Sequence, residues 1–229
     1  DRLAVQNAVI TEAQHKSGYK TLVDLVKARA PNALHVSLPN IGETALTTSD
    51  QHNAWTAIKR GQYELTQEYS YIHEACGLFD LPRSDSQHPT QAGYETEFRR
   101  GARLAAYYLG MGTPNNPLGA KITSATYNAA ADSVTVTVTH NSGSDFAIAD
   151  PDGFWITING TKYQATSVTR NSAMTFTLSG GLTIASGNTV TLSWPGGTHA
   201  DISITDLFLD NATNVCPLRP VFDLAVTEA

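Results

Sequence analysis

The chain has 229 residues, which is enough for one large domain or two of ordinary size. Its net charge of −6 and its lack of a basic run argue against a nucleic-acid partner. Its longest apolar stretches are too short to cross a membrane, so we expect no membrane partner either.

The first half of the chain carries the pattern of an open α/β domain. Apolar residues recur at helical spacing in three stretches, and short apolar runs lie between them. Thr90 stands where a helix N-cap is expected, directly before the third helix. The expected elements, in chain order, are a helix at 19–30, a strand at 33–38, a helix at 51–75, a strand at 77–80 and a helix at 91–109.

The apolar stripes of the first and third helices predict which of their faces are buried. In the first helix the expected inner residues are Tyr19, Leu22, Val23, Val26 and Ala30. In the third helix they are Tyr94, Phe98, Ala102, Ala105 and Leu109.

The composition changes after a cluster of Gly, Pro and Asn at 110–117. Val and Thr alternate at 133–140, which is typical of a half-buried strand. Asn159-Gly160 between two apolar runs predicts a β-hairpin. Strands are expected near 121–127, 133–140, 153–158, 162–169, 173–178, 188–194 and 203–209. We therefore expect an α/β domain at 1–112, a linker at 113–117, and at 118–229 an Ig-like or jelly-roll-like β-sandwich.

Asp85 and His88 form an Asp-x-x-His pair on the loop before the third helix. This spacing lets the carboxylate reach the imidazole of its near neighbour. A Ser-His-Asp hydrolase uses such a pair as its base, in which Asp orients the ring and His takes and then returns the serine proton. No Gly-Asp-Ser stretch occurs in the chain, so a nucleophile is not visible.

The residues around this pair resemble the C-terminal block of the SGNH (GDSL-type) hydrolases, especially the carbohydrate-esterase branch related to sialate O-acetylesterases. The resemblance rests on Phe79-Asp80-Leu81-Pro82 and on His-Pro-Thr-Gln-Ala-Gly-Tyr at 88–94, and it covers roughly 1–112. It implies a three-layer α/β domain that hydrolyses a carboxylic ester, such as an O-acetyl group on a carbohydrate or another small ester. It also implies catalytic roles for Asp85 and His88, and it requires neither a metal nor a cofactor.

The chain departs from this family in lacking the Gly-Asp-Ser block and the third block, Gly-x-Asn-Asp or Gln-Gly-Glu-x-Asp. Its two expected strands are also fewer than the family's sheet contains. Because these blocks and strands are missing, we expect the chain to be the C-terminal portion of a longer hydrolase, and its start on Asp1 and not on Met is typical of a processed or truncated product. The serine and the oxyanion hole would then lie in a missing N-terminal segment or in another chain.

Two further residues are candidates for substrate contacts. Glu43 lies in the loop after the first strand. Trp155, together with Tyr163 and Trp194, could form a sugar-stacking platform in the second domain.

Two other functions stay open at this point. The missing nucleophile also fits a non-catalytic glycan-binding or structural module of a phage tail or cell-surface assembly, for which an extracellular or virion-associated location would be natural. A complete hydrolase with Ser84 or Ser86 as nucleophile is disfavoured, because the serine of a triad belongs on a separate strand-to-helix turn.

Cys76 and Cys216 are the only cysteines, and they fall in different expected domains. We therefore expect two separate buried thiols.

Overall fold

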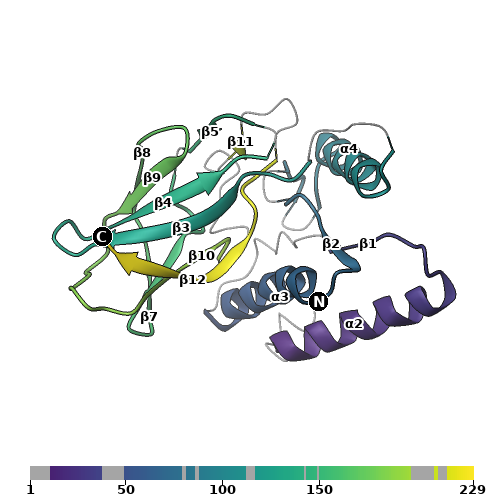
Figure 1. The fold of residues 1–229 in the computed structure, drawn as a ribbon, viewed down its shortest axis with the longest axis horizontal. Helices are drawn as coiled ribbons and strands as arrows, with labels where there is room; N and C mark the ends of the chain where they lie inside the picture. Colours follow the sequence, from purple (N-terminus) through teal and green to yellow (C-terminus); the bar gives the residue numbers. More distant parts are fainter. Residues whose placement is uncertain are drawn as a thin grey trace. The chain divides into compact units, whose positions relative to one another are not determined.

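The computed structural model describes residues 11–37, 49–78, 81–85, 88–111, 117–141, 143–148, 150–196, 209–210 and 216–229. The described residues up to Met111 belong to one compact unit, and those from Pro117 onward belong to a second (Figure 1). We call these unit 1 and unit 2. In the described part of the chain, no helix has the length and apolar character that a membrane crossing needs.

Unit 1 contains α2 (Glu12–Arg29), β1 (His35–Ser37), α3 (Ser49–Glu68), β2 (Ile72–Glu74) and α4 (Gln91–Tyr108). Thr11 and Gln14 start α2 with a capping box, in which each side chain accepts a hydrogen bond from the other's backbone N–H. Thr90 caps α4 as predicted, with its hydroxyl oxygen accepting from the N–H of Gly93 at 3.2 Å.

The strands β1 and β2 are parallel, with His35 opposite Ile72. Ile72 packs in an apolar cluster with Val23 of α2 and Leu65 of α3. The next residue, His73, faces the other side of the pair and stacks on Tyr108 of α4. The strand pair therefore lies between α2 and α3 on one side and α4 on the other (Figure 1). The expected mixture of helices and strands is confirmed.

Three element boundaries in unit 1 were predicted wrongly. The first helix, expected at 19–30, begins at Glu12. The helix expected at 51–75 ends at Glu68, and the second strand is at 72–74 and not at 77–80. Ile72 fits the helical stripe of the preceding residues, so the sequence pattern does not show the break. Pairing with β1 decides it, and the N–H of Ala75 continues that pairing by donating to the Ser37 carbonyl at 3.2 Å. Residues 79–80 lie outside the described residues.

The buried face of α4 also differs from the prediction. Phe98 is 73% exposed and Leu109 is 55% exposed, whereas Arg100 and Leu104 are buried. In α2, Val23 is buried as expected, but Leu22 is 60% exposed. The apolar stripes of both helices therefore lie partly at the surface of this chain.

Unit 2 contains β3 (Lys121–Asn128), β4 (Ser133–Thr139), β5 (Phe146–Ala147), β6 (Trp155–Ile158), β7 (Thr161–Gln164), β8 (Ser167–Arg170), β9 (Thr175–Ser179), β10 (Val190–Trp194), β11 (Leu209–Asp210) and β12 (Val221–Glu228). Eight of them form one curled sheet in the order β7-β6-β10-β12-β3-β4-β9-β8, and β5 pairs with β11 (Figure 1). Alternate residues of β4 point into the core, which gives the expected half-buried pattern.

The predictions for individual strands and turns of unit 2 were partly correct. The hairpin at Asn159-Gly160 is confirmed, and both residues have the positive φ that such a tight turn requires. The strand expected at 162–169 is divided into β7 and β8, and β12 was not expected. The strand expected at 203–209 lies mostly outside the described residues.

Neither Cys76 nor Cys216 is a free thiol, because both are disulfide-bonded. The expectation of two separate thiols is therefore wrong. Spacing along the chain does not by itself decide whether a cysteine is oxidised, so the sequence alone could not show this.

Candidate active site

A short closed loop between β2 and α4 carries Asp85 and His88. Its two ends are held together by hydrogen bonds from the Thr90 N–H to the Pro82 carbonyl at 2.8 Å and from the Ser84 N–H to the His88 carbonyl at 2.9 Å. An isolated bridge between Arg83 and Pro89 lies between them. The loop thus forms a small antiparallel frame that restricts where its side chains can point.

The Asp85 carboxylate binds His88 in two ways. It accepts the backbone N–H of His88 at 2.8 Å through Oδ1. Its Oδ2 lies 2.9 Å from Nδ1 of the imidazole. A single carboxylate therefore fixes both the backbone and the ring of the residue three positions later, which is the contact that the Asp-x-x-His spacing suggests.

This contact determines which ring nitrogen is available for chemistry. With Nδ1 directed at Asp85, the neutral ring favours the tautomer that carries its proton on Nδ1. The Nε2 atom then presents a lone pair, as a general base requires. Among the described residues, no hydroxyl group donates to Nε2 of His88.

Both side chains of the pair are accessible. In the described chain the His88 side chain is 61% exposed and that of Asp85 is 55% exposed. A general base in an ester hydrolase works best when water is excluded around it. A polypeptide segment or substrate that covers the pair is therefore part of any catalytic arrangement.

The first turn of α4 packs closely against the loop. Gly93 lies so near Pro82 and Pro89 that a β-carbon would come within 2.8 Å of both. Farther along the helix, Arg100 donates from Nη1 to the Gly77 carbonyl at 3.0 Å, which ties α4 to the segment after β2. The glycine in the His-Pro-Thr-Gln-Ala-Gly-Tyr run thus permits close packing of the loop on the helix.

Among the described residues, none of the other sequence candidates contacts the His88 imidazole. Ser84 donates its hydroxyl to the carbonyl oxygen of His88 at 3.2 Å and not to the imidazole. Ser86 and Glu43 lie outside the described residues.

Trp155 belongs to β6 of unit 2 and is partly buried. The ammonium of Lys162 lies 5.6 Å from the centroid of its ring, and Gly196 packs against the ring edge. Trp194, expected beside it, is 1% exposed and packs on Phe154 in the core, so it does not belong to a surface platform.

Within the described residues, no group of three His, Cys, Asp or Glu side chains is arranged to hold a metal ion.

Comparisons with known proteins give a likeness in structure alone. No family model matches the chain, and no curated protein matches it in sequence. A crystal structure of a carbohydrate acetylesterase from Xanthomonas citri matches with a TM-score of 0.57 and 13% identity, over 91% of this chain and 45% of that one. This chain therefore spans under half of the length of that esterase, with which it shares a fold.

The N-terminal part of the bacterial S-layer protein SbsC also matches, with a TM-score of 0.35 and 20% identity, over 74% of this chain and 33% of that one. A second SbsC structure has a TM-score of 0.35 and 19% identity, over 75% of this chain and 19% of that one.

Proposed function

We propose that this chain supplies the His-Asp half of the catalytic triad of a carboxylic ester hydrolase, with an O-acetylated carbohydrate as the substrate. The observation that carries the proposal is the 2.9 Å contact between Nδ1 of His88 and Oδ2 of Asp85, on the connection that leads from the carboxyl end of β2 to α4. Open α/β sheets place their ligands at that end of the strands. The shared fold with a carbohydrate acetylesterase supports the choice of substrate class.

In this proposal His88 removes the proton of a serine hydroxyl through Nε2 while the serine oxygen attacks the acetyl carbonyl. The tetrahedral intermediate collapses, and the imidazolium returns the proton to the sugar oxygen that leaves. A water molecule then repeats the sequence on the acyl-serine and releases acetate. Asp85 holds the ring and stabilises the imidazolium that forms in each step.

In this proposal the serine and the oxyanion-hole donors come from an N-terminal segment of the complete protein or from another chain. The coverage of 45% of the esterase is consistent with this arrangement. We propose further that units 1 and 2 correspond to the domains expected at 1–112 and 118–229. Unit 1 would then be the C-terminal part of an SGNH hydrolase domain, and unit 2 an accessory β-sandwich.

The test is esterase kinetics on the protein purified from its complete reading frame. Hydrolysis of p-nitrophenyl acetate and acetate release from an acetylated polysaccharide are measured for wild type, His88→Gln and Asp85→Asn. We expect kcat to fall on the order of 10³-fold or more for His88→Gln and roughly 10²–10⁴-fold for Asp85→Asn, with little change in KM.

Glu95→Gln is the matched control, because it removes an exposed carboxylate of α4 whose contacts are an ion pair of 3.7 Å with Arg99 and a hydrogen bond of 3.2 Å from the Gln91 side chain. It should leave kcat unchanged. Undiminished turnover in His88→Gln, or a complete protein without esterase activity, would contradict the proposal.

The second candidate is a non-catalytic glycan-binding module. It is favoured by the exposure of the pair and by the lack, among the described residues, of a hydroxyl on Nε2 of His88. In that case the complete protein binds the polysaccharide without releasing acetate, and His88→Gln binds it with the same affinity.

A further inference from the structure

Unit 1 contains a cavity of about 330 Å³ at the end of the strand pair opposite to the candidate active site. Its lining comes from residues 31–35, at the start of β1, from Ser70, Tyr71 and His73, at the start of β2, and from the C-terminal ends of α2 and α4. Asp85 and His88 follow β2 at its other end. The cavity is therefore separate from the proposed catalytic pair.

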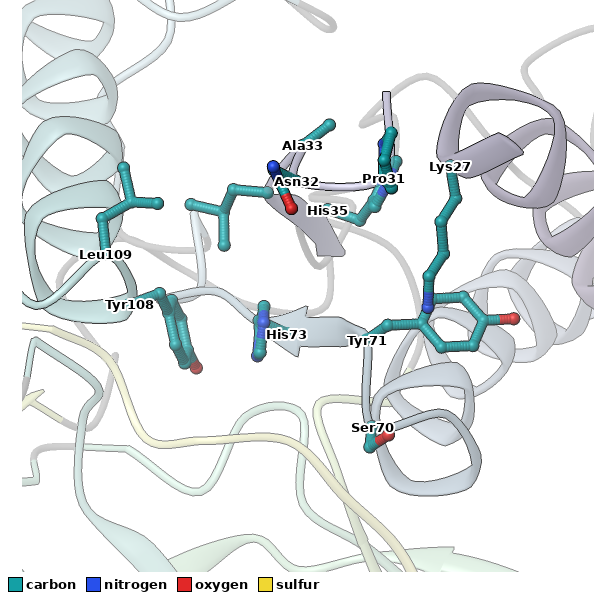
Figure 2. A pocket seen from close by; sticks show the side chains of 11 residues that line it. Lys27, Pro31, Asn32, Ala33, His35, Ser70, Tyr71, His73, Tyr108 and Leu109 are labelled. Carbon is teal, nitrogen blue, oxygen red and sulfur yellow. The ribbon is translucent and has the colours of Figure 1, made fainter. Parts of the chain in front are cut away.

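The ionisable side chains that line this cavity are all basic or phenolic. They are Lys27, His35, His73, Tyr71 and Tyr108, and no Asp or Glu is among the lining residues. Figure 2 shows His35 and His73 between Tyr108 on one side and Lys27 and Tyr71 on the other. This lining contrasts with the net charge of −6 of the chain.

The ammonium of Lys27 rests on an aromatic ring and not on a carboxylate, although the charge of Asp24, one turn earlier on α2, also attracts it. It lies 3.6 Å from the centroid of the Tyr71 ring, and among the described residues it forms no ion pair. Asp24 is instead paired with Lys20 and accepts the Tyr71 hydroxyl at 2.7 Å. The aromatic ring holds Lys27 in place while its charge remains available to a ligand.

Two histidines also line the cavity and offer ring nitrogens to a ligand. The His73 ring stacks on Tyr108 with centroids 4.2 Å apart. Burial and the neighbouring His35 lower the pKa of His73. The Nε2 atom of His35 is buried and has no hydrogen-bond partner in the described residues. When Nε2 of His35 carries the ring proton, it could donate a hydrogen bond to a carboxylate oxygen in the cavity.

The size and walls of the cavity limit the kind of anion. Its volume is at the lower end of the range of about 300–1,000 Å³ for small-molecule pockets and equals roughly eleven water molecules. Tyr71, Tyr108 and Pro31 offer apolar surface, and Asn32 and Ser70 offer hydrogen-bonding groups. We propose that this cavity binds a small organic carboxylate, with Lys27 as its charge partner. The proposal does not depend on the esterase activity.

The experiment is calorimetric titration of the protein at constant ionic strength with four probes. Sodium acetate represents a free short-chain acid, and sodium D-glucuronate represents a carboxylated sugar. D-glucose lacks the charge, and sodium sulfate is an inorganic anion. Saturable binding of acetate, of glucuronate or of both supports the proposal, and the tighter of the two identifies the source of the carboxylate.

Variants test the role of Lys27. Lys27→Met should weaken carboxylate binding at least tenfold, and Lys27→Arg should retain it. Lys121→Met is the matched control, because it removes one charge from an exposed position on β3. If Lys27→Met does not fold, the imidazole NMR signals of the wild-type protein give the same information. Those of His35 and His73 should shift on titration, while that of His140 in unit 2 should not.

Several outcomes would overturn the proposal. In the titrations, these are a failure of both carboxylates to bind, equal affinity for glucose and glucuronate, or sulfate binding as tight as carboxylate binding. For the variant, it is unchanged carboxylate affinity in a folded Lys27→Met protein. In the NMR experiment, it is titration without movement of the His35 and His73 signals.

Discussion

Gly93, in the first turn of α4, lies so close to Pro82 that a β-carbon there would be 2.7 Å from the Pro82 carbonyl oxygen. Gly93→Ala must therefore displace the loop that carries Asp85 and His88. We expect it to lower the free energy of unfolding by about 1–3 kcal/mol and, under the proposed function, to reduce the esterase activity of the complete protein. The measurements are urea denaturation and kcat.

Gly101, on the same helix, is the control for this substitution. Nothing lies within 4 Å of a β-carbon placed there. Gly101→Ala should therefore stabilise the helix by about 0.5–1 kcal/mol and leave kcat unchanged. Equal effects at the two positions would show that the loop does not pack on Gly93 as described.

The contact between Asp85 and His88 predicts a tautomer. In the native protein the neutral His88 ring should carry its proton on Nδ1, because Asp85 Oδ2 lies 2.9 Å from that atom. In Asp85→Asn this preference should be lost or reversed. The ¹⁵N chemical shifts of the ring distinguish the two forms, and the same tautomer ratio in both proteins would remove Asp85 from its orienting role.

Truncation of a side chain should affect the free energy of unfolding on one face of α4 and not on the other. Leu104 is 3% exposed, so Leu104→Ala should lower the free energy of unfolding by about 2–5 kcal/mol. Phe98 is 73% exposed, so Phe98→Ala should change it by no more than about 0.5 kcal/mol. Chemical denaturation of this chain checks both values. A large loss for Phe98→Ala would mean that the apolar stripe faces inward, as its sequence suggests.

We expect the folded protein to lose stability in mild acid because of His15 and His73. Burial lowers the pKa of both rings below 6.5. The unfolded chain therefore binds more protons than the folded chain below pH 6.5, and the free energy of unfolding falls as the pH drops through that value. Above it, the contribution of these two residues is fully present.

Urea denaturation at pH 7.5 and pH 5.0 measures this fall. His15→Gln removes one of the two groups, so the difference between the two pH values should shrink. An undiminished difference would assign the acid sensitivity to other residues.

The candidate pair could be found from the sequence because its geometry is local. Three residues separate Asp85 from His88, and a short loop closed by its own backbone hydrogen bonds keeps that spacing in space. The same holds for Thr90 as a helix cap and for the turn at Asn159-Gly160. In each case the interacting groups lie within a few residues, so side-chain chemistry and backbone preference decide the outcome.

Features that join distant segments depended on the tertiary structure. The end of α3 and the start of β2 are decided by backbone pairing with β1, which the apolar pattern around Ile72 does not show. Which face of α4 is buried depends on what packs against it, because an apolar stripe shows the capacity for burial and not the presence of a partner. The cavity lined by Lys27 and His73 likewise exists only because separate elements meet around it. Local interactions are encoded by adjacent residues, whereas packing is decided by the free energy of the whole unit.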